Sequence, residues 1–268
     1  MRCALITGGT SGIGLAFAHA LAAEGRPLVL VARNPDRLAA VASELAQRYG
    51  VPVDVLPADL ADPEAQNAVA ARLSRGDVSL LVNNAGFSLK TPIVGGDAAL
   101  ADAAWQVMGR APRVLAAAAA AAMLAQPAGD GDRGCVITVS SVSALTRQDS
   151  YSAIKTYALA LSEVLAGELR GTGITVTAVL PGWTHTEFHR RGNQKKSSIP
   201  GFLWLEPERV AAEALRDARR GCVVSIPSRR YRLLAGLLHF APGGAVRSIS
   251  RALGQHRRHD QLPTEDQR

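Results

Sequence analysis

The first 24 residues carry the pattern that most restricts what this chain can fold into. Residues 2–7 form a short apolar run with β-branched side chains, residues 8–14 read GGTSGIG, and residues 15–24 are rich in Ala and Leu. This succession predicts a strand, a glycine-rich turn and a helix. Gly8 permits a tight turn, Gly12 lets a ligand approach the backbone, and Gly14 allows the helix to pack closely on the sheet. A glycine-rich turn is often only a loop, but at the first strand-to-helix junction it favours binding of a dinucleotide phosphate.

The rest of the chain alternates short apolar runs with helical patterns. We expect strands near residues 2–7, 27–32, 52–57, 78–83, 134–140, 173–179 and 221–226. Strands that are apolar throughout suit a parallel sheet covered by helices on both faces. With 268 residues, 47% of them hydrophobic, and no linker, the chain can bury one large core. The sequence therefore predicts an α/β fold, with one domain over residues 1–228 and residues 229–268 as its C-terminal extension.

A second feature, YSAIK at residues 151–155, places Tyr151 and Lys155 one helical turn apart. A free tyrosine has a pKa of about 10, so it exchanges protons poorly at neutral pH unless a positive charge stabilises the phenolate. Residues four apart lie on the same face of a helix, and Lys155 can therefore supply that charge. Such a pair can move a proton to or from a carbonyl oxygen. Taken alone, the pair could equally be an ordinary exposed pair on a helix.

Five motifs together decide between these alternatives. TGGTSGIG at residues 7–14, NNAG at 83–86, SS at 140–141, YSAIK at 151–155 and PGWTHTE at 181–187 occur in this order along the chain. In order and approximate spacing, residues 1–226 resemble the short-chain dehydrogenase/reductase family. The resemblance implies a Rossmann-type, doubly wound parallel sheet of about seven strands in the order 3-2-1-4-5-6-7. It also implies nicotinamide chemistry that interconverts a ketone and a secondary alcohol.

The resemblance implies roles for residues at the carboxyl ends of the strands, where open α/β sheets bind ligands. Tyr151 is the expected general acid and base, Lys155 lowers its pKa and holds the ribose hydroxyls, and Ser141 orients the substrate carbonyl. Ser140 is expected to be structural, and Ser143 is a lesser candidate for the role of Ser141.

Further positions match the cofactor-binding segments of the family. The expected cofactor contacts are Gly8, Thr10, Ser11, Gly12, Ile13, Gly14, Arg33, Asp59, Leu60, Asn83, Ala85, Gly86, Tyr151, Lys155, Pro181, Gly182, Thr184 and Thr186. Two alternatives stay open in these segments. Asp59 could initiate the helix before Pro63, although Asp62 is the better N-cap, and Asn84 could be a structural turn residue.

The end of the second strand, LVLVARN, indicates the choice of cofactor. Ala32 stands where relatives that prefer NAD(H) carry an acid for the ribose 2′-hydroxyl, and Arg33 follows it. A guanidinium there can pair with a 2′-phosphate, and no carboxylate repels that phosphate. NADP(H) is therefore favoured over NAD(H), the alternative being a surface arginine that solvates a turn.

The chain departs from the family at one position. Many relatives carry an asparagine that holds a water near the lysine, but here QVMGRAP aligns Met108 with it, and there is no Asn between Asn84 and Asn193. A thioether donates no hydrogen bond and accepts only weakly, so a proton relay must use other groups. This supports a rival hypothesis, that the chain is an NADP(H)-binding sensor or scaffold with little turnover. We favour an enzyme, because the proton donor, its charge partner and the orienting serine are all present.

Apolar and aromatic side chains gather after the PG dipeptide, where the family builds its substrate lid. They are Trp183, Phe188, Phe202, Leu203, Trp204 and Leu205. An apolar or lipid-like substrate is expected, although such side chains equally often pack a lid shut. His185 and His189 are either polar contacts or solvated loop residues.

Basic charge gathers near the C-terminus. Residues 229–268 contain eight Arg against Asp260, Glu265 and Asp266, so five of the net +7 charges lie there. YRLLAGLLHFA and AVRSISRALGQHRR have the pattern of two amphipathic helices that are too short to span a bilayer. Packing on the protein or on another subunit is favoured over peripheral contact with an anionic membrane. No nucleic-acid motif accompanies the charge, so no nucleic-acid partner is expected.

Cys3, Cys135 and Cys222 each lie in an expected strand, without CxxC spacing or nearby histidines. They predict buried side chains, and neither a metal site nor a disulfide. Gly8 interrupts the first apolar run before it reaches the length of a signal or membrane span, so we expect a cytoplasmic protein. The alanine-rich run at residues 116–122 predicts a helix. The resemblance implies a homodimer or homotetramer assembled through this helix and the helix of Tyr151.

Overall fold

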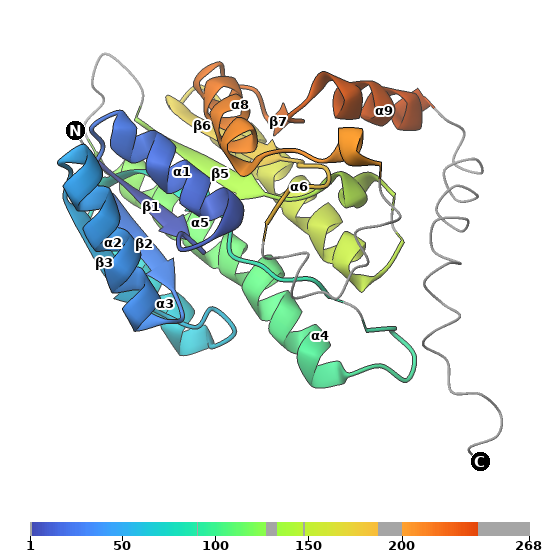
Figure 1. Ribbon diagram of the computed structural model, residues 1–268, viewed down its shortest axis with the longest axis horizontal. Helices are drawn as coiled ribbons and strands as arrows, with labels where there is room; N and C mark the ends of the chain where they lie inside the picture. Colours follow the sequence, from blue (N-terminus) through green and yellow to red (C-terminus); the bar gives the residue numbers. More distant parts are fainter. Residues whose placement is uncertain (1, 90, 127–132, 147, 187–199, 241–268) are drawn as a thin grey trace.

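Parallel strands form one sheet with helices on both of its faces (Figure 1). This computed structural model describes residues 2–89, 91–126, 133–146, 148–186 and 200–240. In sheet order the strands are β3 (Val53–Pro57), β2 (Leu28–Ala32), β1 (Cys3–Thr7), β4 (Val78–Asn83), β5 (Gly134–Val139), β6 (Ile174–Val179) and β7 (Val224–Ser225). Every neighbouring pair is parallel. The predicted α/β class and the strand order 3-2-1-4-5-6-7 are confirmed.

The helices divide between the two faces of the sheet. One face is covered by α1 (Gly12–Ala23), α2 (Pro35–Tyr49) and α8 (Pro207–Arg219), and the other by α3 (Pro63–Leu73), α5 (Ala111–Leu124) and α6 (Ser150–Glu168). The remaining helical elements are α4 (Ala98–Trp105), the π-helix η1 (Gln106–Arg110), the 3-10 helices η2 (Val142–Leu145) and η4 (Gly201–Leu203), and α9 (Arg229–Phe240).

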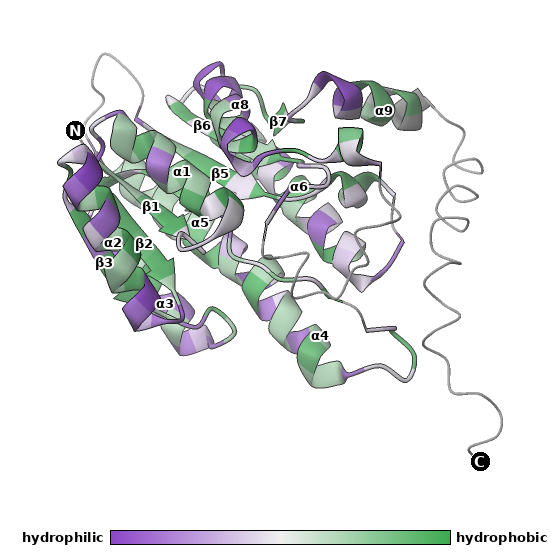
Figure 2. Ribbon diagram, viewed as in Figure 1, coloured by the Kyte–Doolittle hydropathy of each residue, from purple (hydrophilic) through white to green (hydrophobic). Residues whose placement is uncertain are grey.

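The strands are apolar throughout because their side chains alternate between two cores. On β1, Cys3 and Leu5 belong to one cluster of buried side chains, whereas Ala4 and Ile6 belong to the other. Since successive side chains of a strand point to opposite faces, a sheet covered on both sides needs an apolar residue at each position. Figure 2 shows this distribution, with hydrophobic colour along the central strands and hydrophilic colour on the outer surfaces of α2 and α8.

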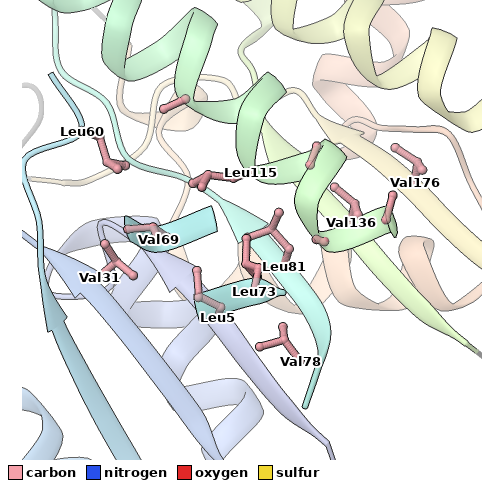
Figure 3. Packing of buried hydrophobic residues seen from close by; sticks show 14 of the residues in the cluster. Leu5, Val31, Leu60, Val69, Leu73, Val78, Leu81, Leu115, Val136 and Val176 are labelled. Atoms are coloured by element: carbon pink, nitrogen blue, oxygen red, sulfur yellow. The ribbon is translucent and has the colours of Figure 1, made fainter. Parts of the chain in front are cut away.

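One of these cores lies between the sheet and the α3, α5 and α6 layer. Figure 3 shows Leu5, Leu81 and Val136, from three adjacent strands, packed with Leu115 of α5. Leu5, Leu81, Leu115 and Val136 are 0% exposed. Burial of each such side chain contributes about 1.5–3 kcal/mol to folding, so this layer holds α5 firmly on the strands of the sheet.

Local signals at the helix ends fix where the helices begin. Asn34 caps α2 by accepting from the Arg37 amide at 2.8 Å, and Asp62 caps α3 in the same way. Asp149 forms a capping box with Ser152 at the start of α6, with both bonds of the box present. These caps satisfy amides that would otherwise lack partners. The capping box sets the first turn of α6, which is the turn that carries the predicted tyrosine.

The alanine-rich segment is helical, as predicted. Residues 98–124 form a continuous helical run of α4, η1 and α5, in which Ala116, Ala119 and Ala120 are buried in the core. By length and composition this run of 27 residues could cross a membrane, a test that buried core helices also pass. Its small side chains let α5 approach the sheet closely.

The seventh strand is shorter than the sequence predicts. The expectation covered residues 221–226, whereas β7 contains only Val224 and Ser225. Gly221 and Cys222 instead close the end of α8, because their amides donate to Ala218 and Asp217. Cys222 is therefore exposed, and the expectation that it is buried in a strand is wrong.

The first of the two predicted C-terminal helices is α9, which lies at the β7 end of the sheet (Figure 1). Tyr231 and Ala235 of α9 are buried, so one face of this helix packs on the protein as expected. The second predicted C-terminal helix lies outside the described residues. Phe188 and His189 of the expected lid also lie outside them.

Candidate active site

The glycine turn after β1 adopts the tight geometry that its sequence predicts. Gly8 has φ +67° and Gly12 has φ +53°, values in the left-handed region that glycine adopts readily. A Cβ atom on Gly14 would lie 2.3 Å from the Gly8 carbonyl oxygen, so α1 can start this close to the strand only with glycine there.

The start of α1 suits an anionic group. Ser11 is the N-cap residue but its side chain makes no capping hydrogen bond, and the first turn contains no acidic side chain. The helix dipole and the first amides of the helix are therefore available to a phosphate. A Cβ on Gly12 would lie 2.9 Å from Thr186 Cγ2, which shows that the loop of residues 181–186 stands directly against this turn. These features fit a dinucleotide with its pyrophosphate at the turn.

Thr7, which the sequence analysis assigned no role, ties the end of β1 to the end of β4. Its hydroxyl accepts hydrogen bonds from the amides of Asn84 at 2.9 Å and Ala85 at 3.0 Å. The Asn84 side chain donates in turn to the carbonyl oxygens of Thr7 and Gly8. Asn84 is thus the structural turn residue that one alternative predicted. The Asn83 side chain is buried and donates to the Pro112 carbonyl on α5.

The structure separates the two readings of the third strand's end. Asp62 is the N-cap of α3, whereas Asp59 accepts from the Ala61 amide at 3.0 Å in a tight local turn. The side chain of Leu60 is buried in the core. Asp59 therefore does not initiate the helix, and its carboxylate lies in the turn that follows β3.

Arg33 lies at the same edge of the sheet as the glycine turn. The Gly8 amide donates to the Val31 carbonyl at 2.7 Å, and Arg33 follows Val31 by two residues. Ala32 ends β2, and Arg33 is exposed. No acidic side chain occupies either position, as the sequence indicates.

The three predicted catalytic residues come together from two neighbouring segments. Ser141, directly after β5, caps η2 by accepting from the Ser143 amide at 3.1 Å, and it also forms a hydrogen bond with Tyr151. Tyr151 and Lys155 lie on α6, with the lysine Nζ 5.6 Å from the centre of the tyrosine ring. Lys155 is 5% exposed, and its Nζ donates to the Val139 carbonyl at 2.9 Å.

Burial dominates the electrostatics of this group. Loss of water around the ammonium lowers the pKa of Lys155 to about 8. Burial also raises the pKa of the Tyr151 phenol, the negative charge of Asp149 raises it further, and the hydrogen bond with Ser141 lowers it. Tyr151 is therefore protonated at neutral pH and ready to donate. The lowering of its pKa by Lys155, which the sequence predicts, stays a prediction.

The two serines of the SS pair have different partners. The Ser140 hydroxyl donates to the Lys155 carbonyl at 2.7 Å and is buried, which joins β5 to α6. Its role is structural, as expected, whereas the next serine faces the tyrosine. The Ser143 hydroxyl oxygen is buried without a hydrogen-bond partner among the described residues.

Met108 and Lys155 both lie close to Gly86, at the position that the sequence analysis singled out. Met108 is 1% exposed and lies within the π-helix η1, an irregularity that is frequent at functional sites. A Cβ on Gly86 would lie 3.1 Å from Met108 Sδ and 3.8 Å from Lys155 Nζ. The thioether and the lysine are therefore both neighbours of Gly86 in the NNAG loop.

The two ends of the expected lid segment, residues 183–186 and 200–205, pair with each other. Thr184 and Leu205 form a parallel bridge, in which the Leu205 amide donates to Trp183 and the His185 amide donates to Leu205. The His185 ring stacks on Trp204, with ring centres 4.6 Å apart. His185 is 44% exposed, so it is solvated, as one of the two alternatives predicts, while its ring packs on Trp204. The Thr184 hydroxyl is buried and donates to the Gly182 carbonyl.

Two important residues escaped the sequence analysis. Thr7 could have been noticed in the sequence, because it is a polar residue at the end of an apolar strand. Tyr231 of α9 contacts the lid from 48 residues away in the chain, and no local pattern signals such a contact.

Comparison with known proteins agrees with this geometry. The family model for short chain dehydrogenases matches residues 2–197. A galactitol 2-dehydrogenase that forms L-tagatose, from Cereibacter sphaeroides, is 33% identical over 253 residues, covering 90% of this chain and 94% of the relative.

Two solved structures share the fold over nearly the whole chain. A short-chain dehydrogenase from Sphingobium yanoikuyae in complex with NADPH has a TM-score of 0.79 and 32% identity, covering 91% of this chain and 97% of its own. The bulky-bulky ketone specific alcohol dehydrogenase from Comamonas testosteroni has a TM-score of 0.74 and 28% identity, covering 99% and 96%. The chain described here belongs to the short-chain dehydrogenase/reductase family of NAD(P)-dependent oxidoreductases.

Proposed function

We propose that this protein is an NADP(H)-dependent oxidoreductase that interconverts a ketone and a secondary alcohol, with Tyr151 as the general acid and base. The observation that carries the proposal is the meeting of Ser141, Tyr151 and Lys155 at the strand ends that also carry the glycine turn. A proton donor, an orienting hydroxyl and a buried cation are the groups that carbonyl reduction requires.

Each of the three residues has a step that its position explains. NADPH, when bound, supplies hydride to the substrate carbon. Tyr151 donates its proton to the substrate oxygen, and Ser141 holds that oxygen through its hydroxyl. As the proton leaves, a negative charge develops on the phenol close to the Lys155 ammonium, which stabilises it. Asp149 fixes the first turn of α6 through the capping box and so holds the phenol in place.

The preference for NADP(H) rests on the end of β2. Arg33 is exposed there beside the glycine turn, and Ala32 provides no carboxylate to repel a 2′-phosphate. A charge-assisted pair with phosphate is stronger than a neutral hydrogen bond. The relative from Sphingobium yanoikuyae was solved with NADPH, which supports the same choice.

The substrate that we propose is apolar or lipid-like. The compared relatives include a galactitol dehydrogenase and an enzyme for bulky ketones, so the choice rests on residues of this chain. Trp183 and Trp204 have ring centres 5.9 Å apart, and His185 stacks on Trp204. An aromatic lid of this kind offers large apolar surfaces to a substrate.

A panel of ketones tests both the activity and the substrate class. NADPH oxidation should be fastest with ketones that carry bulky apolar groups on both sides and slowest with keto sugars. Tyr151→Phe should lower turnover at least about 100-fold while leaving NADPH affinity within about threefold. Tyr157→Phe, a matched change at the half-buried tyrosine of the same helix that packs on Trp105, should keep turnover. Equal turnover by wild type and Tyr151→Phe on every accepted ketone would disprove the mechanism.

The position of Met108 at Gly86, where Lys155 also lies, favours a second candidate, a protein that binds NADP(H) as a sensor or scaffold with little turnover. A thioether cannot pass a proton onward. The two candidates give different results in one experiment. Tight NADPH binding in a fluorescence titration, combined with no turnover across the whole ketone panel, would favour the sensor.

We further propose a homo-oligomer assembled through the outer faces of the α4–α5 run and α6. Trp105 is 42%, Leu124 41% and Val164 60% exposed on this side, which are large apolar exposures for a free surface. Light scattering after size exclusion should give a dimer or a tetramer, and Val164→Glu should lower the assembled fraction. A wild-type monomer at micromolar concentration would contradict this proposal.

We also propose a peripheral membrane contact through the outer face of α9. Leu233 is 67%, Leu234 46% and Leu237 63% exposed, and Arg229 and Arg230 are exposed on the same helix. An apolar stripe bordered by cations complements an anionic lipid surface. Vesicles with anionic lipid should co-sediment the wild type, and Leu233→Glu with Leu237→Glu should abolish this. Equal sedimentation with purely zwitterionic vesicles, or none at all, would contradict it.

A further inference from the structure

Tyr231 of α9 links the two ends of the lid segment. Its hydroxyl accepts a hydrogen bond from the Trp183 amide at 3.1 Å and donates one to the Leu203 carbonyl at 2.8 Å. Tyr231 is 6% exposed, and burial raises the pKa of its phenol, so the proton that it donates to Leu203 stays in place. One side chain thus satisfies a donor and an acceptor that are 20 residues apart in sequence.

The ring of Tyr231 also explains why Gly182 has no side chain. A Cβ on Gly182 would lie 2.0 Å from Tyr231 Cζ, a distance that no atom pair tolerates. Gly182 is not one of the glycines with positive φ, so space rather than backbone conformation requires glycine there. The PG dipeptide and α9 are therefore fitted to each other.

The contacts continue from α9 to the start of α1. Beyond Gly182, the same loop carries Thr184, whose hydroxyl donates to the Gly182 carbonyl, and Thr186, whose methyl group lies against Gly12. Any displacement of the loop at Tyr231 therefore changes the space above the glycine turn.

A second contact from α9 reaches the other end of the lid. The Arg230 guanidinium donates to the Phe202 carbonyl and lies over the Phe202 ring, 5.8 Å from its centre. Two consecutive residues of α9 thus hold the 3-10 helix η4. Within the described part of the chain, Leu233 and Leu237 of α9 stay exposed.

We propose that Tyr231 is a positioning residue for cofactor binding, which joins the loop of residues 181–186 to η4 and so holds this loop against the glycine turn. It acts through the loop backbone and does not contact the reacting atoms. This inference rests on the proposed function, because it takes the glycine turn as the cofactor site. It makes the C-terminal extension a part of the binding machinery.

The test removes the hydroxyl and keeps the ring. Tyr231→Phe leaves the Trp183 amide and the Leu203 carbonyl without their partner, so the loop of residues 181–186 should be held less firmly against the glycine turn. We expect the dissociation constant for NADPH, measured by fluorescence titration of the full chain, to rise about tenfold, which corresponds to one buried polar pair. The turnover number at saturating NADPH should change less than about threefold.

Tyr49→Phe is a matched control. The Tyr49 hydroxyl bonds His19 at 3.2 Å between α1 and α2, so this change also removes one partly buried hydroxyl bond, but away from the lid. It should lower thermal stability to a similar extent and leave NADPH affinity within twofold. An effect of the same size in both variants would reduce the role of Tyr231 to general stability and overturn the proposal.

A double-mutant cycle tests the ring contact independently. Gly182→Ala should weaken NADPH binding by pushing the ring away, whereas in a Tyr231→Ala background it should add little, because the space is already empty. Additive effects would show that the two residues act separately and would overturn the inference. Hydrogen exchange of the Trp183 amide, which needs no cofactor, should accelerate in Tyr231→Phe. Failure of the wild type to bind NADPH would instead overturn the proposed function, and the positioning role with it.

Discussion

The Lys155 ammonium donates a hydrogen bond to the carbonyl oxygen of Val139, the last residue of β5, at 2.9 Å. This bond spans from α6 to the strand end, while Ser140 closes the same junction in the opposite direction by donating to the Lys155 carbonyl. The lysine side chain is thereby fixed in a site with very little water. Burial in such a site disfavours the charged form of the lysine, because the ammonium loses its hydration.

The first prediction concerns pH. The pKa of Lys155 falls from 10.5 to about 8 on folding, which corresponds to roughly 3 kcal/mol against the charged form. Between about pH 8 and pH 10.5, Lys155 of the unfolded chain carries a proton that Lys155 of the folded chain lacks. This group therefore makes the free energy of unfolding rise with pH across that window. At pH 7, Lys155→Met should be more stable than the wild type, and the difference should narrow above pH 8. Urea denaturation at several pH values measures it, and parallel pH profiles of the two proteins would contradict it.

A second prediction concerns the missing asparagine. Met108→Asn places an amide next to Gly86, where Lys155 also lies, and should raise turnover several-fold, because an amide both donates and accepts hydrogen bonds. The same change should cost about 1–3 kcal/mol of stability, since it buries a polar group in an apolar position. Met108→Leu is the control, with similar volume and no polar atom. Equal turnover numbers for the Asn and Leu variants would show that this position takes no part in proton transfer.

Arg33 gives a third prediction. Arg33→Ala should weaken NADPH binding by about 10-fold to 100-fold and leave NADH binding unchanged, because only NADPH carries the 2′-phosphate. Arg75→Ala, which removes another exposed arginine beyond the end of α3, controls for the loss of overall positive charge. Isothermal titration with both cofactors checks the result. An equal loss of affinity for NADPH and NADH would place Arg33 outside the phosphate site.

The glycine turn gives a fourth prediction with a built-in comparison. Gly12 and Gly25 both have positive φ, but a Cβ on Gly12 would press on Thr186, whereas a Cβ on Gly25 would meet nothing within 4 Å. Each change to alanine should cost about 1–2 kcal/mol from the left-handed backbone. Only Gly12→Ala should also weaken NADPH binding, by more than tenfold. Denaturation and titration of the two variants separate the effects, and equal NADPH affinities would refute a role for Gly12 in the site.

Much of the fold could be predicted because its signals are local. The apolar runs, the glycine turn and the caps at Asn34 and Asp62 each act within a few residues. The order of the strands follows from the family resemblance together with the alternation of strands and helices. The seventh strand was predicted too long because apolar residues and a cysteine follow α8, and the sequence does not show that Gly221 and Cys222 bond back to that helix.

Contacts between distant segments account for what was missed in the site. The predicted roles of Ser140 and Ser141 could be separated by the motif, and the structure gives these serines different partners. The partners of Thr7 and Tyr231 lie 77 and 48 residues away, so only the assembled sheet shows them. Met108 was found from the sequence because it stands in a motif position, but its place in a π-helix has no signal in the residues around it.

The tyrosine on α9 has a consequence for biosynthesis. Because residue 231 follows every other described part of the site, a growing polypeptide contains its proton donor and glycine turn long before the residue that joins the ends of the lid. A truncated chain that ends shortly before residue 231 would contain all of the sheet strands but lack the side chain that joins the two ends of the lid segment.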